Sequence, residues 1–132
     1  MSVLEVRNLN VQYHMEQDIY QAVRGISFSV EQGEIAGIVG ESGSGKSTAM
    51  LAVMGLLKGN AAVTADEITV SGGAPCPGRN IAMIFQDSLS CLNPSVRIGR
   101  QIAETVRVRE GCTWREAKKR ALELLDLVGI RQ

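Results

Sequence analysis

The nine-residue segment Gly40–Thr48, Gly-Glu-Ser-Gly-Ser-Gly-Lys-Ser-Thr, constrains the fold of this chain more than any other part of its sequence. It matches the phosphate-loop pattern G-x-x-x-x-G-K-[ST] at every fixed position. Its glycines permit a tight turn and leave no Cβ between the backbone N–H groups and an anion. Lys46 brings a positive charge to the phosphates, and Ser47 brings a hydroxyl to Mg²⁺. The predicted phosphate-binding residues are Gly40, Glu41, Ser42, Gly43, Ser44, Gly45, Lys46, Ser47 and Thr48.

The sequence on either side of the loop has the expected character. Ile35–Val39 is a short apolar run typical of a buried parallel strand. Thr48–Met54 favours a helix until Gly55 interrupts it. Strand, loop and helix in this order distinguish a phosphate loop from a flexible linker. A dinucleotide-binding loop is disfavoured, because no G-x-G-x-x-G sequence is present here.

Composition excludes several other classes of protein. The chain has 132 residues with zero net charge, which gives no support to a nucleic-acid partner. Three widely spaced cysteines and one histidine argue against a zinc site or a disulfide framework, and favour a reducing cytosol. The longest apolar run, Ala49–Leu57, is too short to span a bilayer.

Two segments before the loop alternate apolar and polar residues, as half-buried strands do. They are Leu4–Tyr13 and Ala22–Val30, joined by a polar connection at His14–Tyr20. We expect them to be antiparallel strands. After the loop helix, short strands are expected at Glu67–Ser71 and Ile81–Phe85.

The last third of the chain has the pattern of two helices. The first is expected over Val96–Arg109, and Gly111 ends it. Thr113 and Glu116 form a capping-box pattern that opens the second helix. Its apolar stripe consists of Ala117, Ala121, Leu124, Leu125 and Val128. Such a stripe packs inside its own domain.

The order of these motifs resembles the ATP-binding subunit of an ABC transporter, nearest in pattern to the oligopeptide, dipeptide and nickel uptake subfamily. The segments that carry the resemblance are Ala22–Val30, Gly33–Thr48, Ile81–Asp87 and Leu92–Pro94. The resemblance spans nearly the whole chain. Only the segment between Gly72 and Asn80 is shorter than the peptide-transporter pattern, which leaves the solute open.

The resemblance implies an α/β fold of the P-loop NTPase, ABC type. Antiparallel N-terminal strands and parallel core strands would surround the phosphate-loop helix. We expect a nucleotide-binding core over residues 1–87 and the start of a helical subdomain over residues 88–132.

The resemblance also implies roles for individual residues. Tyr13 matches the aromatic residue that stacks on adenine, with Tyr20 as a rival for that role, and Val23 matches a position under the base or ribose. Gln86 matches the glutamine that contacts Mg²⁺ or the attacking water. The implied catalytic residues are Lys46 and Gln86, the implied metal ligands are Ser47 and Gln86, and the cofactors are ATP and Mg²⁺.

The implied function is to power import of peptides or nickel from the cytoplasmic face of the membrane. The implied partners are permease subunits, a second ATP-binding subunit in a homo- or heterodimer and, indirectly, an extracytoplasmic solute-binding protein. The sequence holds no Leu-Ser-Gly-Gly-Gln signature, no apolar strand ending in Asp-Glu and no switch histidine. We therefore expect the N-terminal half of a longer subunit, which binds ATP without efficient hydrolysis.

Three alternatives stay open at this point. A soluble ABC-type ATPase acting on ribosomes or DNA shares the phosphate loop and the glutamine, but the chain has no basic stripe. A small P-loop kinase tends to open with its phosphate loop, whereas two strands precede the loop here. The chain could also serve only as a binding or regulatory module.

Overall fold

The computed structural model describes residues 2–87 and 91–130, which form two compact units. The first unit comprises residues 1–81 and the second residues 82–132. The boundary that the sequence predicts, between residues 87 and 88, adjoins positions 88–90, which lie outside the described residues. That boundary stays a prediction, and each unit is described by itself.

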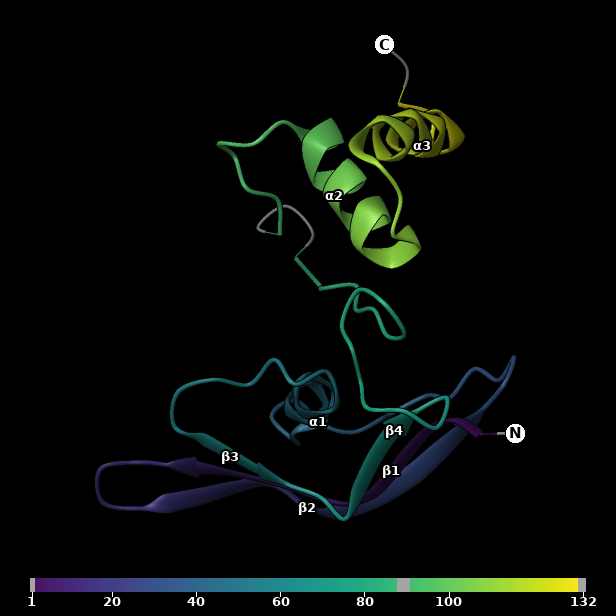
Figure 1. Ribbon diagram of the computed structural model, residues 1–132. Helices are drawn as coiled ribbons and strands as arrows, with labels where there is room; N and C mark the ends of the chain where they lie inside the picture. The colour runs from purple at the N-terminus through teal and green to yellow at the C-terminus, as the bar shows by residue number, and fades with distance from the viewer. Residues whose placement is uncertain (1, 88–90, 131–132) are drawn as a thin grey trace. The chain divides into compact units, whose positions relative to one another are not determined.

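The first unit is a four-stranded antiparallel sheet organised around one long strand, β1 (Ser2–His14). β2 (Ile19–Glu31) pairs with one edge of β1, whereas β3 (Ala61–Thr64) and β4 (Glu67–Val70) pair with the other (Figure 1). The two antiparallel strands predicted before the loop are therefore confirmed, as is the strand predicted after Asp66. β3 was not predicted.

The β1–β2 pairing is interrupted by bulges near its middle. Asn8 and Gly25 both have positive φ, at 51° and 57°, and the register shifts between Val6 and Leu9. Side chains replace the missing ladder bonds: the Gly25 N–H donates to Asn10 Oδ1 at 2.8 Å. Bulges of this kind bend and twist a strand pair, and Figure 1 shows the sheet bent rather than flat.

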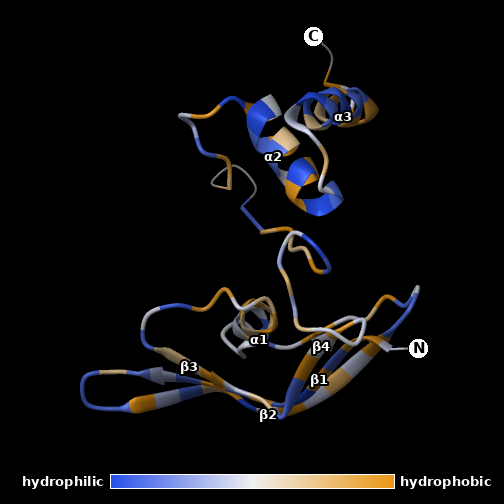
Figure 2. Ribbon diagram, in the orientation of Figure 1, coloured by the Kyte–Doolittle hydropathy of each residue, from blue (hydrophilic) through white to orange (hydrophobic). Residues whose placement is uncertain are grey.

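Helix α1 (Lys46–Val53) packs against this sheet and completes the core of the first unit. The buried core residues are Val6, Leu9, Val11, Val23, Ala49, Ala52 and Val53. Figure 2 shows α1 apolar around most of its surface, as expected for a helix with little exposure to water. The predicted helix after the phosphate loop is confirmed, and its packing fixes where that loop ends.

Two predicted strands are absent from the structure. Residues 35–39 form neither strand nor helix, and Ile35 is 99% exposed. Residues 82–86 are likewise irregular, with Ile84 96% exposed, and Ile81 makes only an isolated bridge with Pro77. A strand needs a neighbour for its backbone hydrogen bonds, and among the described residues no strand pairs with either segment. The prediction of parallel core strands at these positions is therefore not met, although the α/β class is.

The second unit contains two packed helices, α2 (Ile98–Glu110) and α3 (Trp114–Leu127). Their contact is made by small side chains, Ala103, Val106, Ala117 and Ala121, which are all buried. The predicted stripe on α3 is thus confirmed at Ala117, Ala121 and the half-buried Leu124, which packs against this cluster, whereas Val128 at its end is exposed. Among the described residues, no helix is both long and apolar enough to cross a membrane.

Trp114, the only tryptophan of the chain, is the first residue of α3. Its side chain is exposed. The Arg107 guanidinium lies 5.0 Å from the centre of its ring, in a cation–π contact. Trp114 therefore supports the turn between α2 and α3 from the surface.

The capping box at the start of α3 is present as predicted. Glu116 accepts hydrogen bonds from the Thr113 hydroxyl at 2.7 Å and the Thr113 N–H at 2.8 Å, and its own N–H donates to Thr113 Oγ1. These bonds, the hydroxyl first and the backbone second, hold the pKa of the Glu116 carboxyl below its usual value. The ionised form is thus favoured in the folded helix.

The capping box predicts a pH-dependent contribution to the stability of α3. Because the folded pKa of Glu116 is lowered, its stabilisation is present above the unfolded pKa and lost as pH falls through the folded pKa. We expect the difference in melting temperature between wild type and Glu116→Gln to shrink as the pH falls from 7 to 3. Thermal melts followed by circular dichroism measure this. A difference that stays constant over that range would contradict the lowered pKa.

Candidate functional site

The phosphate-loop motif occupies the turn into helix α1. Gly45 is the N-cap of the helix, with φ 90° and ψ 6°, and no side chain caps the helix start. The first N–H groups of any helix have no partner within the helix. Here they belong to Lys46, Ser47 and Thr48, and the first turn contains no acidic residue. Such a helix start favours an anion.

Gly45 also determines how closely the loop approaches the sheet. A Cβ at this position would lie 2.5 Å from the Ala22 carbonyl oxygen of β2 and 3.6 Å from Val23 Cγ2. Real Cβ atoms essentially never come as close as 2.5 Å to another heavy atom. The positive φ of Gly45 also disfavours any residue with a side chain. The third glycine of the motif therefore packs the loop directly against β2.

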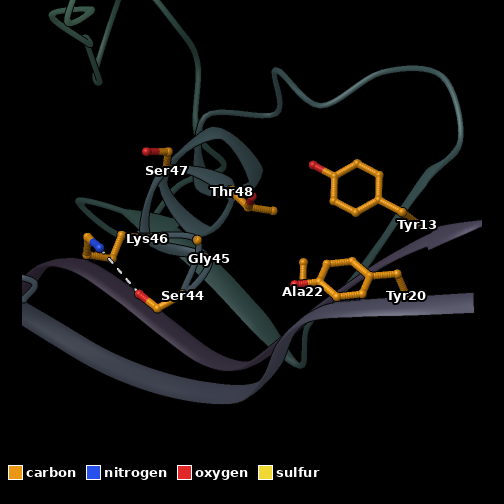
Figure 3. A pocket seen from close by; sticks show the side chains of 9 residues that line it. Tyr13, Tyr20, Ala22, Ser44, Gly45, Lys46, Ser47 and Thr48 are labelled. Carbon is orange, nitrogen blue, oxygen red and sulfur yellow. Dashed lines mark hydrogen bonds between the residues drawn. The ribbon is translucent and has the colours of Figure 1, made fainter. Parts of the chain in front are cut away.

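Lys46 closes the loop on itself. Its ammonium donates to the carbonyl oxygens of Gly40 at 2.7 Å and Glu41 at 2.6 Å, and to Ser44 Oγ at 3.3 Å. Figure 3 shows the bond to Ser44. An ammonium has three N–H donors and no acceptor, so these contacts use its full capacity. The positive charge is thereby held within the loop.

A pocket of about 180 Å³ lies between this loop and the end of the β1–β2 hairpin. Its lining consists of Tyr13, Tyr20, Ala22, Gly43, Ser44, Gly45, Lys46, Ser47 and Thr48. In Figure 3 the two tyrosines lie at the hairpin end, and the loop and the start of α1 lie at the other. The pocket therefore combines aromatic side chains with a helix N-terminus and a lysine, which suits a ligand with a planar ring and a charged tail.

The structure places most of the predicted site residues together. Tyr13 shares the pocket with residues 43–48, whereas Gly40 and Glu41 meet Lys46 through their carbonyl oxygens. Ser42 is exposed in the loop. Val23 is buried in the core and is not part of the lining; its neighbour Ala22 is. A ligand contact of Val23 stays a prediction.

Gln86 is exposed and belongs to the second compact unit. Its predicted contact with Mg²⁺ or water is not tested by the arrangement within the first unit, so this role also stays a prediction.

Ala22 was not among the predicted site residues, and Tyr20 was predicted only as a rival to Tyr13. The hairpin register explains why Tyr20 and Ala22 belong to the pocket. A turn over Met15–Asp18, closed by the Met15 N–H and the Asp18 carbonyl at 2.8 Å, sets Tyr13 opposite Tyr20. Tyr20 and Ala22 are two residues apart on one strand, the spacing of residues that share a face.

A glycine-rich loop that opens a helix against a sheet defines this protein as one of the P-loop nucleotide-binding class. Comparison with known families makes the class more specific: the family described as "ABC transporter" matches residues 23–132. The match covers most of the chain, which therefore belongs to the ABC transporter family.

Similar proteins with assigned names are ATP-binding proteins of peptide transport. The dipeptide transport ATP-binding protein DppD of Haemophilus influenzae is 44% identical over 140 aligned positions, covering 98% of this chain and 42% of that protein. The oligopeptide transport ATP-binding protein OppD of Mycobacterium tuberculosis is 42% identical, over 98% of this chain and 23% of its own length. The peptide transport system ATP-binding protein SapD of Salmonella typhimurium is 38% identical, over 99% and 44%.

The chain spans less than half the length of these relatives. The alignment with DppD is also longer than the 132 residues of the chain, so that relative has positions which this chain lacks. Whether they fall between Gly72 and Asn80, where the sequence is short, stays a prediction.

Proposed function

We propose that this chain binds ATP as part of the subunit that powers peptide import by an ABC transporter. The observation that carries the proposal is that one pocket brings an aromatic side chain, Tyr13, together with the loop Gly43–Thr48 at the start of α1. Aromatic rings suit a flat base, and a helix N-terminus with a lysine suits a polyphosphate.

The residues present fit ATP and its Mg²⁺. The backbone at Gly45 lies too close to β2 to leave room for a Cβ. The helix-start residues Lys46, Ser47 and Thr48 line the pocket, where their N–H groups would donate to phosphate oxygens. Lys46 would exchange its loop carbonyls for the β- and γ-phosphates, and Ser47 would supply a hydroxyl to Mg²⁺. ATP would supply the phosphoryl group whose transfer drives transport. This chain's own residues bind it, orient it and neutralise its charge.

We also infer that this chain binds ATP without efficient hydrolysis. Phosphoryl transfer depends on groups that position water and stabilise charge. The sequence lacks the signature sequence, the Asp-Glu pair after an apolar strand and the switch histidine that would supply them. Gln86 would add the sensing of Mg²⁺ or water, through an amide that both accepts and donates.

The proposed partners follow from the family. They are permease subunits in the membrane, a second ATP-binding subunit and, indirectly, an extracytoplasmic solute-binding protein, with the chain at the cytoplasmic face. The names of the similar proteins favour peptides over nickel as the solute. They also favour a transporter over a soluble ABC-type ATPase acting on ribosomes or DNA.

Loss of the Lys46 ammonium tests the proposed nucleotide site. We expect Lys46→Ala to weaken binding of a fluorescent ATP analogue by about ten- to a hundredfold, since charge-assisted hydrogen bonds contribute about 1.5–3 kcal/mol. Fluorescence titration in the presence of Mg²⁺ measures the dissociation constant.

Lys58→Ala is the matched control, because Lys58 is an exposed lysine of the same unit that does not line the pocket. It should leave the affinity unchanged. Equal affinities for wild type and Lys46→Ala would exclude the site. Robust phosphate release from ATP by the wild-type chain, abolished by Lys46→Ala, would instead refute the inference that hydrolysis is inefficient.

A further inference from the structure

We propose that Tyr20 is a second base-binding residue, which forms with Tyr13 a two-ring aromatic wall for a purine base. This inference rests on the proposed nucleotide site and goes beyond it. It assigns base recognition to a cross-strand pair rather than to a single aromatic residue.

The hairpin register places the two rings at one end of the pocket. Tyr13 on β1 pairs directly with Tyr20 on β2 in the antiparallel register. Side chains directly opposite each other on such a pair are near neighbours on the same face. Both tyrosines line the pocket, and Figure 3 shows both rings reaching from the hairpin toward the loop side.

Tyr20 is available to a ligand. The residue is 54% exposed, and the phosphate-loop residues lie at the other end of its pocket. Covering a solvent-exposed aromatic ring with another apolar surface is favourable in free energy, because it removes apolar area from water. Tyr13 is only half-buried, so its ring is also open to contact.

Ala22 provides the space between ring and loop. It lies two residues after Tyr20 and lines the same pocket, and its backbone carbonyl is the group nearest the Gly45 position. A methyl side chain leaves open the path from the rings to the loop, which a larger side chain would occupy. The lining thus runs from the aromatic wall, past a small residue, to the anion-binding helix start.

The shape of the wall favours a purine nucleotide. A pocket of about 180 Å³ is smaller than the roughly 300–1,000 Å³ that enclose a whole ligand, so it holds one part of the nucleotide. A bicyclic base covers more of two rings than a single-ring base does. The hydroxyl groups are not required for this contact, because stacking uses the ring faces.

The test separates base binding from phosphate binding. Calorimetric titration measures the affinity of the chain for ATP and for inorganic tripolyphosphate, which has the charge but no base. Tyr20→Ala is expected to weaken ATP binding by about five- to a hundredfold, the range for loss of a base–aromatic stack. Tripolyphosphate binding should not change. Tyr20→Phe should bind ATP like the wild type, since it keeps the ring.

Ile19→Ala is the matched control, because Ile19 is an exposed apolar residue of the same strand, 61% accessible, that does not line the pocket. It should leave both affinities unchanged. The wall is refuted if Tyr20→Ala binds ATP as tightly as the wild type, or if it weakens ATP and tripolyphosphate equally.

Lys46→Ala distinguishes this failure from failure of the proposed function. If Lys46→Ala weakens both ligands but Tyr20→Ala weakens neither, the phosphate site stands and only the aromatic wall is wrong. If Lys46→Ala leaves ATP binding intact, the proposed nucleotide site itself is wrong, and the wall is rejected with it.

Discussion

Replacing Gly45 with alanine is expected to destabilise the first unit and to abolish nucleotide binding. Two costs add. A residue with a Cβ at φ 90° costs about 1–2 kcal/mol, and forcing extra atoms into a packed site costs about 1–3 kcal/mol more. The second cost arises because the new Cβ would lie 2.5 Å from the Ala22 carbonyl oxygen, which is backbone and cannot rotate away. The loop must therefore move away from β2.

That movement displaces the N–H groups at the start of α1. We expect ATP affinity to fall more than the stability loss alone explains, because these N–H groups are the proposed anion site. Urea unfolding gives the free energy of unfolding, and titration with a fluorescent ATP analogue, under conditions where the variant is folded, gives the affinity.

Gly43→Ala and Gly33→Ala separate the two costs. Both glycines have φ 79°, yet a Cβ at either would meet nothing within 4 Å. Each variant should lose only the backbone part, about 1–2 kcal/mol. A Gly45→Ala variant no less stable than these two would show that the close approach to Ala22 does not constrain the loop.

Local sequence signals predicted the loop, its helix and the capping box because their interactions are local. The bonds of Lys46 reach no farther than six residues, and those of Thr113 reach three. Strands β1 and β2 were also predictable, since both alternate in hydropathy and a four-residue turn joins them.

The segment Ile35–Val39 was predicted to be a strand from its local sequence, but it forms none. Its apolar run describes the environment that a buried parallel strand needs, not the neighbours that provide it. Parallel neighbours are distant in sequence, and among the described residues none pairs with this segment. The short strand β3, Ala61–Thr64, was not predicted, because its sequence has no alternating pattern. Pairing with β1 is what makes it a strand.

The site was predicted residue by residue, whereas the pocket is built from pairs. Val23 was assigned to the ligand and lies in the core; Ala22, one position away, lines the pocket. A one-residue shift along a strand exchanges its two faces. Val23 was matched to the ligand through the family resemblance and not through its face of the strand, and its contact with a ligand stays a prediction.

Leu9→Ala is expected to have the largest effect of a single substitution on the sheet that carries the site. Leu9 is 0% exposed and has the largest fully buried side chain among the described residues. It belongs to the cluster in which β1, β2 and α1 meet. Truncating a buried leucine to alanine costs about 2–5 kcal/mol, through lost contacts and the cavity left behind. For a chain of marginal stability this is a large fraction of the total.

The substitution should also reduce nucleotide binding, although Leu9 does not line the pocket. The same core holds α1, whose first residues form the loop, to β2, whose residues Tyr20 and Ala22 form the opposite wall. A cavity in that core loosens both at once. Denaturant unfolding measures the loss of stability, and ATP titration at temperatures below the melting transition measures the loss of affinity.

Leu127→Ala provides the matched control, because it removes the same atoms from a side chain that is 81% exposed. Surface substitutions of this kind change stability by about 0.5 kcal/mol or less. If Leu9→Ala were as stable as Leu127→Ala, the cluster around β1 would not be the core of the unit. If it were destabilised yet bound ATP normally wherever it is folded, the pocket would not depend on how α1 is seated on the sheet.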